Sequence, residues 1–250
     1  MKRFLLITAI SFSSFAYADN GFYTSLKSGI SDTKFDNNKD QLSVTDEEEF
    51  NFKDTFHNTD ANKSIYPNIS AAIGFDFSKM SNVNARAELE YTYKDKAKFS
   101  PNLNKITFED DEFSETIDLP NGTPGLFINE LKSQSLMFNA YYDFKNSSKF
   151  TPHVSAGVGV TRIKNKQKFN PDFIEDNSTL SDTSNNFTWA AGVGVAYQVT
   201  KNVALDLGYR YVDAGDIEFN NQNVFEEGIN LKSTADLVSH DYSLGIRYNF

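Results

Sequence analysis

The stretch Val238-Ser-His-Asp-Tyr-Ser-Leu-Gly-Ile-Arg-Tyr-Asn-Phe250 decides the fold of this chain. From Tyr242 to Phe250 every second residue is apolar, and the residues between them are polar or glycine and include the charged Arg247. A period of two is typical of a β-strand with one apolar face. In a membrane β-barrel the apolar face contacts lipid, the polar face lines the lumen and an aromatic end lies at the interface. The stretch therefore predicts the closing strand of such a barrel.

The N-terminus has the pattern of a secretory signal peptide. A basic start, Met1-Lys2-Arg3, is followed by an apolar run and by the small-residue site Ala16-Tyr17-Ala18. The apolar run is too short for a membrane-spanning helix. The sequence predicts a signal peptide at residues 1–18 and an outer-membrane β-barrel at residues 19–250.

The composition excludes several classes of protein. The net charge is −10, whereas a nucleic-acid-binding protein needs clustered lysine and arginine, so we expect no nucleic-acid partner. The chain has no cysteine, which excludes disulfides and thiolate chemistry. It has 23 phenylalanines and 12 tyrosines, which suit pleated strands.

Seven earlier segments repeat the alternation of the closing strand. Each is long enough to cross an outer membrane as a tilted strand. The segments are residues 22–30, 65–77, 83–93, 135–144, 152–162, 187–199 and 203–211. The sequence thus predicts an all-β fold, an eight-stranded antiparallel transmembrane β-barrel. The residues expected to face lipid include Leu89, Phe138, Val158, Val193, Leu207 and Ile246.

The connections distinguish this barrel from a soluble one. Alternation also occurs in soluble lipocalin-type barrels. Here three short connections, at residues 78–82, 145–150 and 200–202, alternate with four long ones, and a membrane barrel likewise has periplasmic turns and extracellular loops. The long connections hold 26 acidic and 10 basic residues, and we expect them to bury little. The alternative is that some of them extend the strands beyond the membrane as hairpins, since residues 107–108 and 117–119 are strand-like.

Charged residues on the lumen side are the sharpest candidate site. Both signs occur at each height, and charges in a water-poor lumen need partners. We expect Arg210 to pair with Glu88 or Glu90, and Arg86 or Arg247 to pair with Asp206 or Asp143. The candidate network comprises Lys27, Arg86, Glu88, Glu90, Asp143, Asp206, Arg210 and Arg247. It would act either as a structural plug of salt bridges or as a gated ion path.

Catalytic, cofactor and metal sites are not predicted. The acidic runs at residues 46–49 and 109–112 lack EF-hand spacing and read more simply as solvated loop segments, although a hard cation is the alternative. His57, His153 and His240 are scattered, so the sequence does not indicate a zinc site. No Ser–His or Asp–His constellation is evident, and we expect the chain not to be an enzyme.

Three motifs resemble a known family. Ala156-Gly-Val-Gly-Val160, Leu205-Asp-Leu-Gly-Tyr-Arg-Tyr211 and Leu244-Gly-Ile-Arg-Tyr-Asn-Phe250 resemble the eight-stranded opacity and surface-antigen porins, which belong with the transmembrane domain of outer membrane protein A. The ending also resembles the assembly signal that the barrel assembly machinery reads, with Tyr248 and Phe250 as its aromatic residues. The resemblance implies a surface-exposed barrel in the lipid of the Gram-negative outer membrane, often an adhesin or antigen.

Three functions remain open at this point. In the first, the acidic loops bind a host-cell receptor or matrix protein while the barrel stays plugged. In the second, the barrel is a small porin-like channel for ions or small solutes. In the third, it is an outer-membrane hydrolase. Fold resemblance alone does not decide between them.

Overall fold

The computed structural model describes residues 21–45, 51–58, 62–170, 179–222, 224 and 228–250. The expected signal peptide, residues 1–18, lies outside the described residues, and so does the acidic run at residues 46–49. No helix in the described part of the chain is long and apolar enough to cross a membrane.

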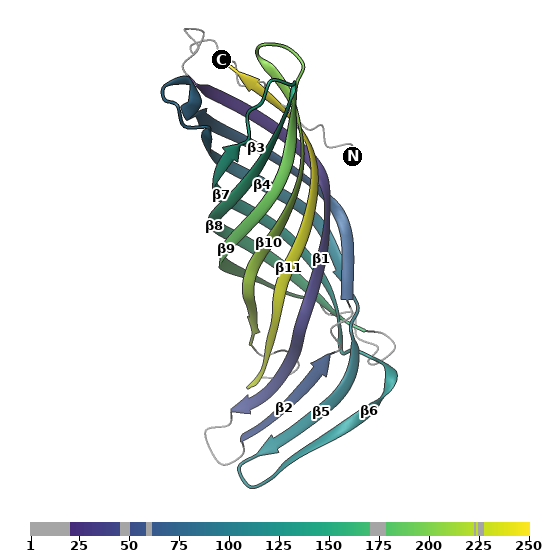
Figure 1. Cartoon of the computed structure of the whole chain (residues 1–250). Helices are drawn as coiled ribbons and strands as arrows, with labels where there is room; N and C mark the ends of the chain where they lie inside the picture. The colour runs from purple at the N-terminus through teal and green to yellow at the C-terminus, as the bar shows by residue number, and fades with distance from the viewer. Residues whose placement is uncertain (1–20, 46–50, 59–61, 171–178, 223, 225–227) are drawn as a thin grey trace, which may run out of the picture.

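Strands make up almost all of the described structure. They are β1 (Phe22–Thr45), β2 (Asn51–Asn58), β3 (Asn62–Asp76), β4 (Ala85–Phe99), β5 (Asn102–Asp110), β6 (Ser114–Pro124), β7 (Phe127–Asp143), β8 (Phe150–Phe169), β9 (Thr179–Gln198), β10 (Val203–Asn221) and β11 (Ile229–Asn249), with one 3-10 turn, η1 (Phe77–Lys79). Eight of them pair in the order β11-β10-β9-β8-β7-β4-β3-β1, and pairing of β11 with β1 closes the barrel (Figure 1). All pairings are antiparallel, so the predicted eight-stranded antiparallel barrel is confirmed.

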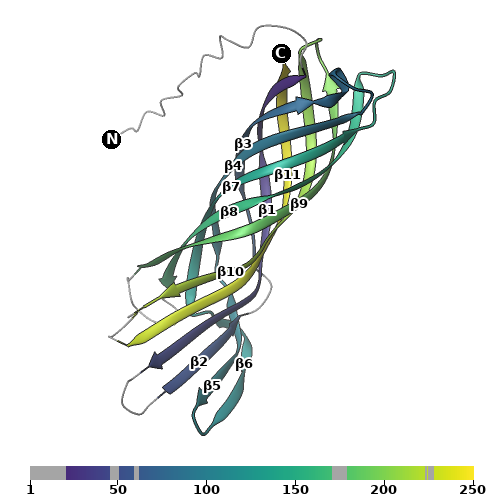
Figure 2. The ribbon, with the colours of Figure 1, turned by 90° about the vertical axis from the view of Figure 1, so that its left-hand side faces the viewer.

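The two ends of the barrel differ. Short connections join β3 to β4 through η1, β7 to β8 through residues 144–149, and β9 to β10 through residues 199–202. Figure 1 shows the C-terminus at this end, which we call the turn end. Strands β2, β5 and β6 lie at the opposite end, which we call the loop end (Figures 1 and 2).

An apolar band surrounds the barrel. The six residues expected to face lipid are exposed on its outer surface, from Leu89 on β4 to Ile246 on β11, which confirms their orientation. Aromatic rings border the band on both sides, as at the two interfaces of a membrane barrel. At the turn end the ring pairs are Phe22–Phe75, Tyr142–Phe144, Phe150–Tyr197 and Tyr248–Phe250. At the loop end they are Trp189–Tyr211 and Tyr209–Tyr242.

The strands continue past this band, into segments that the sequence predicted to bury little and, in part, to extend the strands as hairpins. Strand β1 ends at Thr45 rather than at residue 30, and β8 ends at Phe169 rather than at residue 162. The expectation that these segments bury little is wrong, because their inward positions carry apolar side chains that form a core inside the extended barrel. This core contains Phe35, Tyr66, Ala97, Phe99, Leu131, Ile163, Ala214, Ile217, Phe219, Ala235 and Leu237.

A further sheet extends from the loop end. Past the point where β3 begins, the outer part of β1 pairs with β2, β2 pairs with β5, and β5 pairs with β6 (Figures 1 and 2). We call β2, β5, β6 and residues 39–45 of β1 the outer sheet. Residues 107–108 and 117–119 lie in β5 and β6, which confirms their strand character. A second apolar cluster fixes the sheet to the barrel: Phe56, Leu103, Leu126, Phe127, Phe169 and Leu231.

Bulges mark where β1, β4 and β10 leave the membrane band. The register of β1 against β11 shifts between Asp36 and Lys39, and that of β10 against β11 shifts between Asp213 and Asp216. Asn37 and Gly215 have positive φ values of 50° and 66° at these positions. A bulge bends its strand and increases the local twist, so these strands change direction at the end of the membrane band.

Candidate functional site

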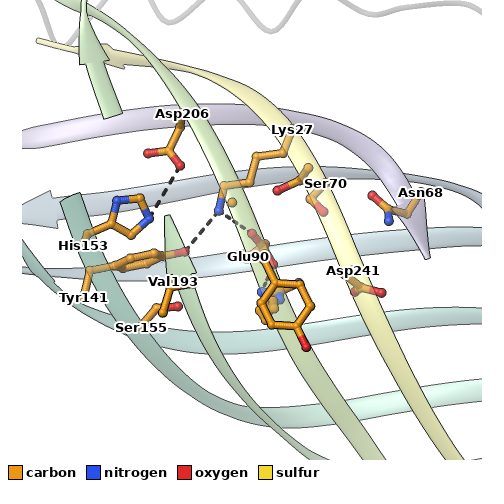
Figure 3. Close-up of a pocket in the computed structure, with 14 residues that line it drawn as sticks. Lys27, Asn68, Ser70, Glu90, Tyr141, His153, Ser155, Val193, Asp206 and Asp241 are labelled. Atoms are coloured by element: carbon orange, nitrogen blue, oxygen red, sulfur yellow. Dashed lines mark hydrogen bonds and ion pairs between the residues drawn. The ribbon is translucent and has the colours of Figure 1, made fainter. Parts of the chain in front are cut away.

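A network of charges fills the middle of the lumen. Lys27 Nζ on β1 lies 2.7 Å from Glu88 Oε1 and 2.6 Å from Glu90 Oε2, both on β4. Arg210 Nη1 on β10 lies 2.7 Å from Glu90 Oε1. The Tyr141 hydroxyl donates to Glu88 Oε1 at 3.0 Å (Figure 3 shows Lys27, Glu90 and Tyr141). The structure thus brings four predicted residues together, two cations and two carboxylates from three strands.

A second pair lies nearer the turn end. Arg86 Nε and Nη2 donate to the two oxygens of Asp143 at 2.8 and 2.9 Å, and both side chains are about 95% buried or more, with 3% and 5% exposed. The Arg86 guanidinium also lies 4.4 Å from the centroid of the Tyr141 ring. Two parallel hydrogen bonds give a guanidinium–carboxylate pair its most specific geometry.

The remaining predicted residues, Arg247 and Asp206, do not pair with each other among the described residues. Asp206 Oδ1 lies 3.6 Å from His153 Nε2. Arg247 is buried, its Nε and Nη1 atoms have no hydrogen-bond partner in the described structure, and its guanidinium lies 5.6 Å from the centroid of the Tyr23 ring. It borders a small cavity together with Arg86 and Asp206.

Sequence reasoning missed a third pair. Lys94 Nζ on β4 lies 2.8 Å from Asp241 Oδ1 on β11 and donates to Ser239 Oγ at 2.7 Å. The alternation could have revealed this pair, because Lys94 lies on the same face of its strand as Glu88 and Glu90, and Asp241 lies on the same face as Arg247. The predicted strand at residues 83–93 stopped one residue short of Lys94.

Two inward glycines make room for rings in this crowded interior. A Cβ on Gly74 would lie 2.2 Å from the ring of Tyr23, and a Cβ on Gly194 would lie 2.5 Å from Nε2 of His153. Small residues opposite large ones let an eight-stranded barrel fill its own interior.

The cavities beside the charges are small. One of about 40 Å³ borders Lys27, Glu90, Arg210 and Asp241, and another of about 10 Å³ borders Arg86 and Arg247. A single buried water needs roughly 10–15 Å³ on this scale, so the two together hold a few water molecules. Above them the apolar core of the extended strands closes the lumen toward the loop end.

The larger cavity also borders a serine, a histidine and an aspartate. Ser155, His153 and Asp206 line it (Figure 3), but no hydrogen bond joins the serine to the histidine in the described structure. Nucleophilic catalysis needs that contact and space for a substrate. A volume of about 40 Å³ admits water rather than a substrate. Among the described residues no group of three or more His, Cys, Asp or Glu side chains has the arrangement of a metal site.

The outer sheet contains a buried carboxylate. Asp40 Oδ1 accepts a hydrogen bond from Ser233 Oγ at 2.6 Å, and its Oδ2 accepts one from Asn58 Nδ2 at 2.9 Å. Burial raises the pKa of the Asp40 carboxyl, and these two hydrogen bonds act in the opposite direction. Asn58 Oδ1 has no hydrogen-bond partner in the described structure. The group joins β1, β2 and β11 where the barrel becomes the outer sheet.

The far end of the outer sheet exposes apolar side chains. Phe108 on β5 is 37% exposed, Phe113 in the β5–β6 turn 54%, and Ile117 on β6 44%. We call these three residues the tip patch. The register places Phe108 opposite Glu115 and opposite Asp54, so carboxylates flank the patch on both sides.

Comparison with known proteins identifies relatives of the whole barrel. The family model described as "Outer membrane protein beta-barrel domain" matches residues 3–250. The chain is 33% identical over 180 residues to "Outer membrane protein PagN" of Salmonella typhimurium strain LT2, covering 72% of this chain and 71% of that protein.

More distant relatives carry names that point to the cell surface. The chain is 24% identical over 209 residues to "Opacity protein opA67" of Neisseria gonorrhoeae, covering 75% of this chain and 78% of that protein. It is 26% identical over 117 residues to a protein of Rickettsia bellii strain OSU 85-389 named as a "Putative adhesin", covering 46% of this chain and 51% of that protein.

Proposed function

Because this chain belongs to the family of outer membrane protein β-barrel domains, with relatives among the opacity proteins, and lies in the outer membrane, we propose that it is an adhesin whose outer sheet binds a host-cell or matrix protein. In such barrels the short turns face the periplasm and the long connections face outward, so the outer sheet is extracellular. The opacity and adhesin relatives support a role in contact with other cells.

The outer sheet is the observation that carries this proposal. In the described part of the chain, two of the four long connections form a sheet that is continuous with the barrel through β1 and fixed by its own apolar cluster. Binding residues are commonly placed on segments that a rigid scaffold positions. A folded support reduces the conformational entropy that a flexible loop would lose on binding.

The tip patch suggests the chemistry of the partner. Phe108, Phe113 and Ile117 are exposed beside the carboxylates of Asp54 and Glu115. Protein interfaces combine an apolar centre with a polar rim. The complementary surface would be an apolar protein patch with a basic rim.

The lumen favours binding over transport or catalysis. In the described part of the barrel the cavities beside the ion pairs are small and the apolar core lies above them, so we infer that the network is a structural plug and that the resting barrel conducts little. We likewise infer that the protein acts by binding rather than by hydrolysis. Planar-bilayer recordings of the purified protein test the plug, and a large, steady conductance of the unmutated barrel would contradict it.

An attachment assay tests the adhesin proposal. Bacteria expressing the protein are scored for binding to cultured mammalian cells and to immobilised matrix proteins. The tip variant Phe108→Ser/Phe113→Ser/Ile117→Ser should lose most of the attachment. Its matched control on the same hairpin is Lys105→Ser/Glu109→Ser/Asp118→Ser, whose register positions lie on the other face of β5 and β6, and it should keep attachment.

Removal of the hairpin provides a second test. Gly125 N donates to Pro101 O at 2.9 Å, so the two ends of the β5–β6 hairpin are adjacent and residues 102–124 can be replaced by a short linker. The shortened barrel should reach the cell surface and fail to support attachment. Undiminished attachment by both the tip variant and the shortened barrel would refute the proposal.

A further inference from the structure

Four cations form a column on the outer surface of β8. Arg162, Lys164, Lys166 and Lys168 alternate with buried residues and are all exposed. They continue the row of Val158 and Val160, which faces lipid. We call the four cations the basic column. Such a cluster of positive charge is unexpected in a chain whose net charge is −10.

Neighbouring strands do not neutralise the column. None of its four side chains forms an ion pair with a described residue. On β9 the residues paired with them are Asn185, Thr183, Ser181 and Thr179, which carry no charge. On β7 the position opposite Lys164 is another cation, Lys132, and Glu130 opposite Lys166 has its carboxylate 3.7 and 3.6 Å from Lys96 and Lys98.

Strands β10, β11 and β1, on the other side of β9, carry the reverse charge. Beyond the loop-end aromatic rings, β1, β10 and β11 carry Asp36, Asp213, Asp216 and Asp236 at outward positions. The carboxyls of Asp216 and Asp236 are close enough that their hydrogen bond and repulsion raise the pKa of Asp216. The barrel is therefore positive on β8 and negative on β10 and β11 just outside the membrane band.

The register sets the height of the column. Val160 pairs with Phe187, next to the aromatic ring at the loop end, and Arg162 is the next outward residue. A rise of about 3.3 Å per residue and a tilt of about 40° place successive outward residues about 5 Å apart in height. Arg162 then lies about 5 Å and Lys168 about 20 Å above Val160, whereas the polar layer of a bilayer leaflet is only about 5–8 Å thick.

We propose that the basic column binds the phosphates of lipopolysaccharide in the surrounding outer leaflet. Its continuity with the lipid-facing valines points to a ligand that is itself part of the membrane. Cations just outside the hydrocarbon attract anionic headgroups. A phospholipid phosphate would reach Arg162 and Lys164 only, so the height of Lys166 and Lys168 calls for a headgroup whose sugars carry phosphate further from the membrane.

The experiment measures retention of phosphorylated lipid by the full-length protein. The chain is folded into phosphatidylcholine nanodiscs with limiting amounts of rough lipopolysaccharide phosphorylated on lipid A and on the inner core, and the bound amount is measured by mass spectrometry. The test variants are Arg162→Gln/Lys164→Gln, Lys166→Gln/Lys168→Gln and their combination. The control, with the same change in net charge as the combination, replaces Lys53, Lys63, Lys105 and Lys232 by glutamine.

Each pair variant should lower the retention of lipopolysaccharide. Each cation near an anionic surface strengthens binding about fivefold, so each pair variant, which removes two cations, should weaken retention about 25-fold. Retention by the control should stay near that of the wild type. With phosphatidylglycerol in place of lipopolysaccharide, Arg162→Gln/Lys164→Gln should lower retention and Lys166→Gln/Lys168→Gln should not. Dephosphorylated lipopolysaccharide should be retained equally by all variants.

Three results would overturn the proposal. One is equal retention of phosphorylated lipopolysaccharide by the wild type and both pair variants. Another is an equal loss in the control, which would mean that net charge alone decides. The third is normal lipid retention combined with loss of binding to a soluble sulfated polysaccharide, because the column would then serve a host polyanion. Heat-modifiable electrophoretic mobility confirms that each variant is folded. If the combined variant does not fold, the results of the two pair variants test the proposal.

Discussion

Replacing Glu90 by glutamine should destabilise the barrel far more than the same change at the surface. Glu90 has a side chain that is 1% exposed and lies within 2.6 Å of Lys27 and 2.7 Å of Arg210. Glutamine keeps the shape and removes the charge, so the cluster changes from balanced to a net positive charge. Lys27 retains Glu88 at 2.7 Å, whereas Arg210 loses its ion-pair partner.

The magnitude follows from that loss. Removing one partner of a buried pair costs about 3–5 kcal/mol, because the other charge remains buried without compensation. The matched control is Glu109→Gln on β5, whose carboxylate lies 3.3 Å from Lys53 while both side chains are nearly half exposed. An exposed pair contributes about 0–1 kcal/mol. The two identical chemical changes should therefore differ by about 2–5 kcal/mol in the free energy of unfolding.

The assay is urea unfolding in lipid vesicles, followed by heat-modifiable mobility. The double variant Glu90→Gln/Arg210→Gln removes both charges and should recover part of the loss, because the uncompensated cation is then absent. Two results would contradict a dry lumen. One is that Glu90→Gln and Glu109→Gln lower the free energy of unfolding by the same amount within about 0.5 kcal/mol. The other is that the double variant loses more stability than the sum of the losses of Glu90→Gln and Arg210→Gln.

Three other perturbations test the membrane position, the topology and the outer sheet. Leu89→Arg at the lipid face should cost about 2–4 kcal/mol in the same urea assay, and a tolerated arginine would contradict the outward assignment. Because the chain has no cysteine, Glu112→Cys should react with an impermeant maleimide on intact cells, whereas Ser147→Cys in a short turn should react only after lysis; the reverse labelling would invert the topology. The raised pKa of Asp40 means that the outer sheet is most stable below the unfolded carboxyl pKa of about 3.9 and loses stability as the pH rises through the folded pKa. Asp40→Asn should remove that loss and make the sheet more resistant to proteolysis at pH 7, because the Asn58 amide, once flipped, can accept a hydrogen bond from the new amide group. An unchanged pH profile would refute this role.

The membrane half of the fold could be predicted because lipid enforces the pattern. Nearly every outward residue between the aromatic rings is apolar, Thr24 and Ser28 on β1 being exceptions, so the alternation around Leu89 or Ile246 is unbroken, and the inward charges follow from parity. The same alternation predicted that Glu90 and Arg210 both face the lumen. It did not specify which atoms meet, because that depends on the register between strands.

The outer half could not be predicted in the same way, because water surrounds its outer face. There the outward positions are polar or charged, and only the inward ones, such as Ile217 and Phe219, show that a strand continues. Short alternations of this kind also occur in irregular loops. The basic column illustrates the difficulty, since Arg162 ends a predicted strand while Lys166 and Lys168 fall in a predicted loop.

The seam between β1 and β11 has a consequence for the order of folding. These strands come from opposite ends of the chain and pair from Tyr23 with Asn249 to Val44 with Ile229, through the membrane and into the outer sheet. Contacts between such distant segments carry the largest loop-closure entropy, so they form late. Phe35 and Leu237, in the core above the lumen, meet across this seam, as do Asp40 and Ser233. A barrel that has inserted without closing therefore lacks the part of its core that spans the seam and the support of its outer sheet, and only completely assembled molecules have the folded outer sheet.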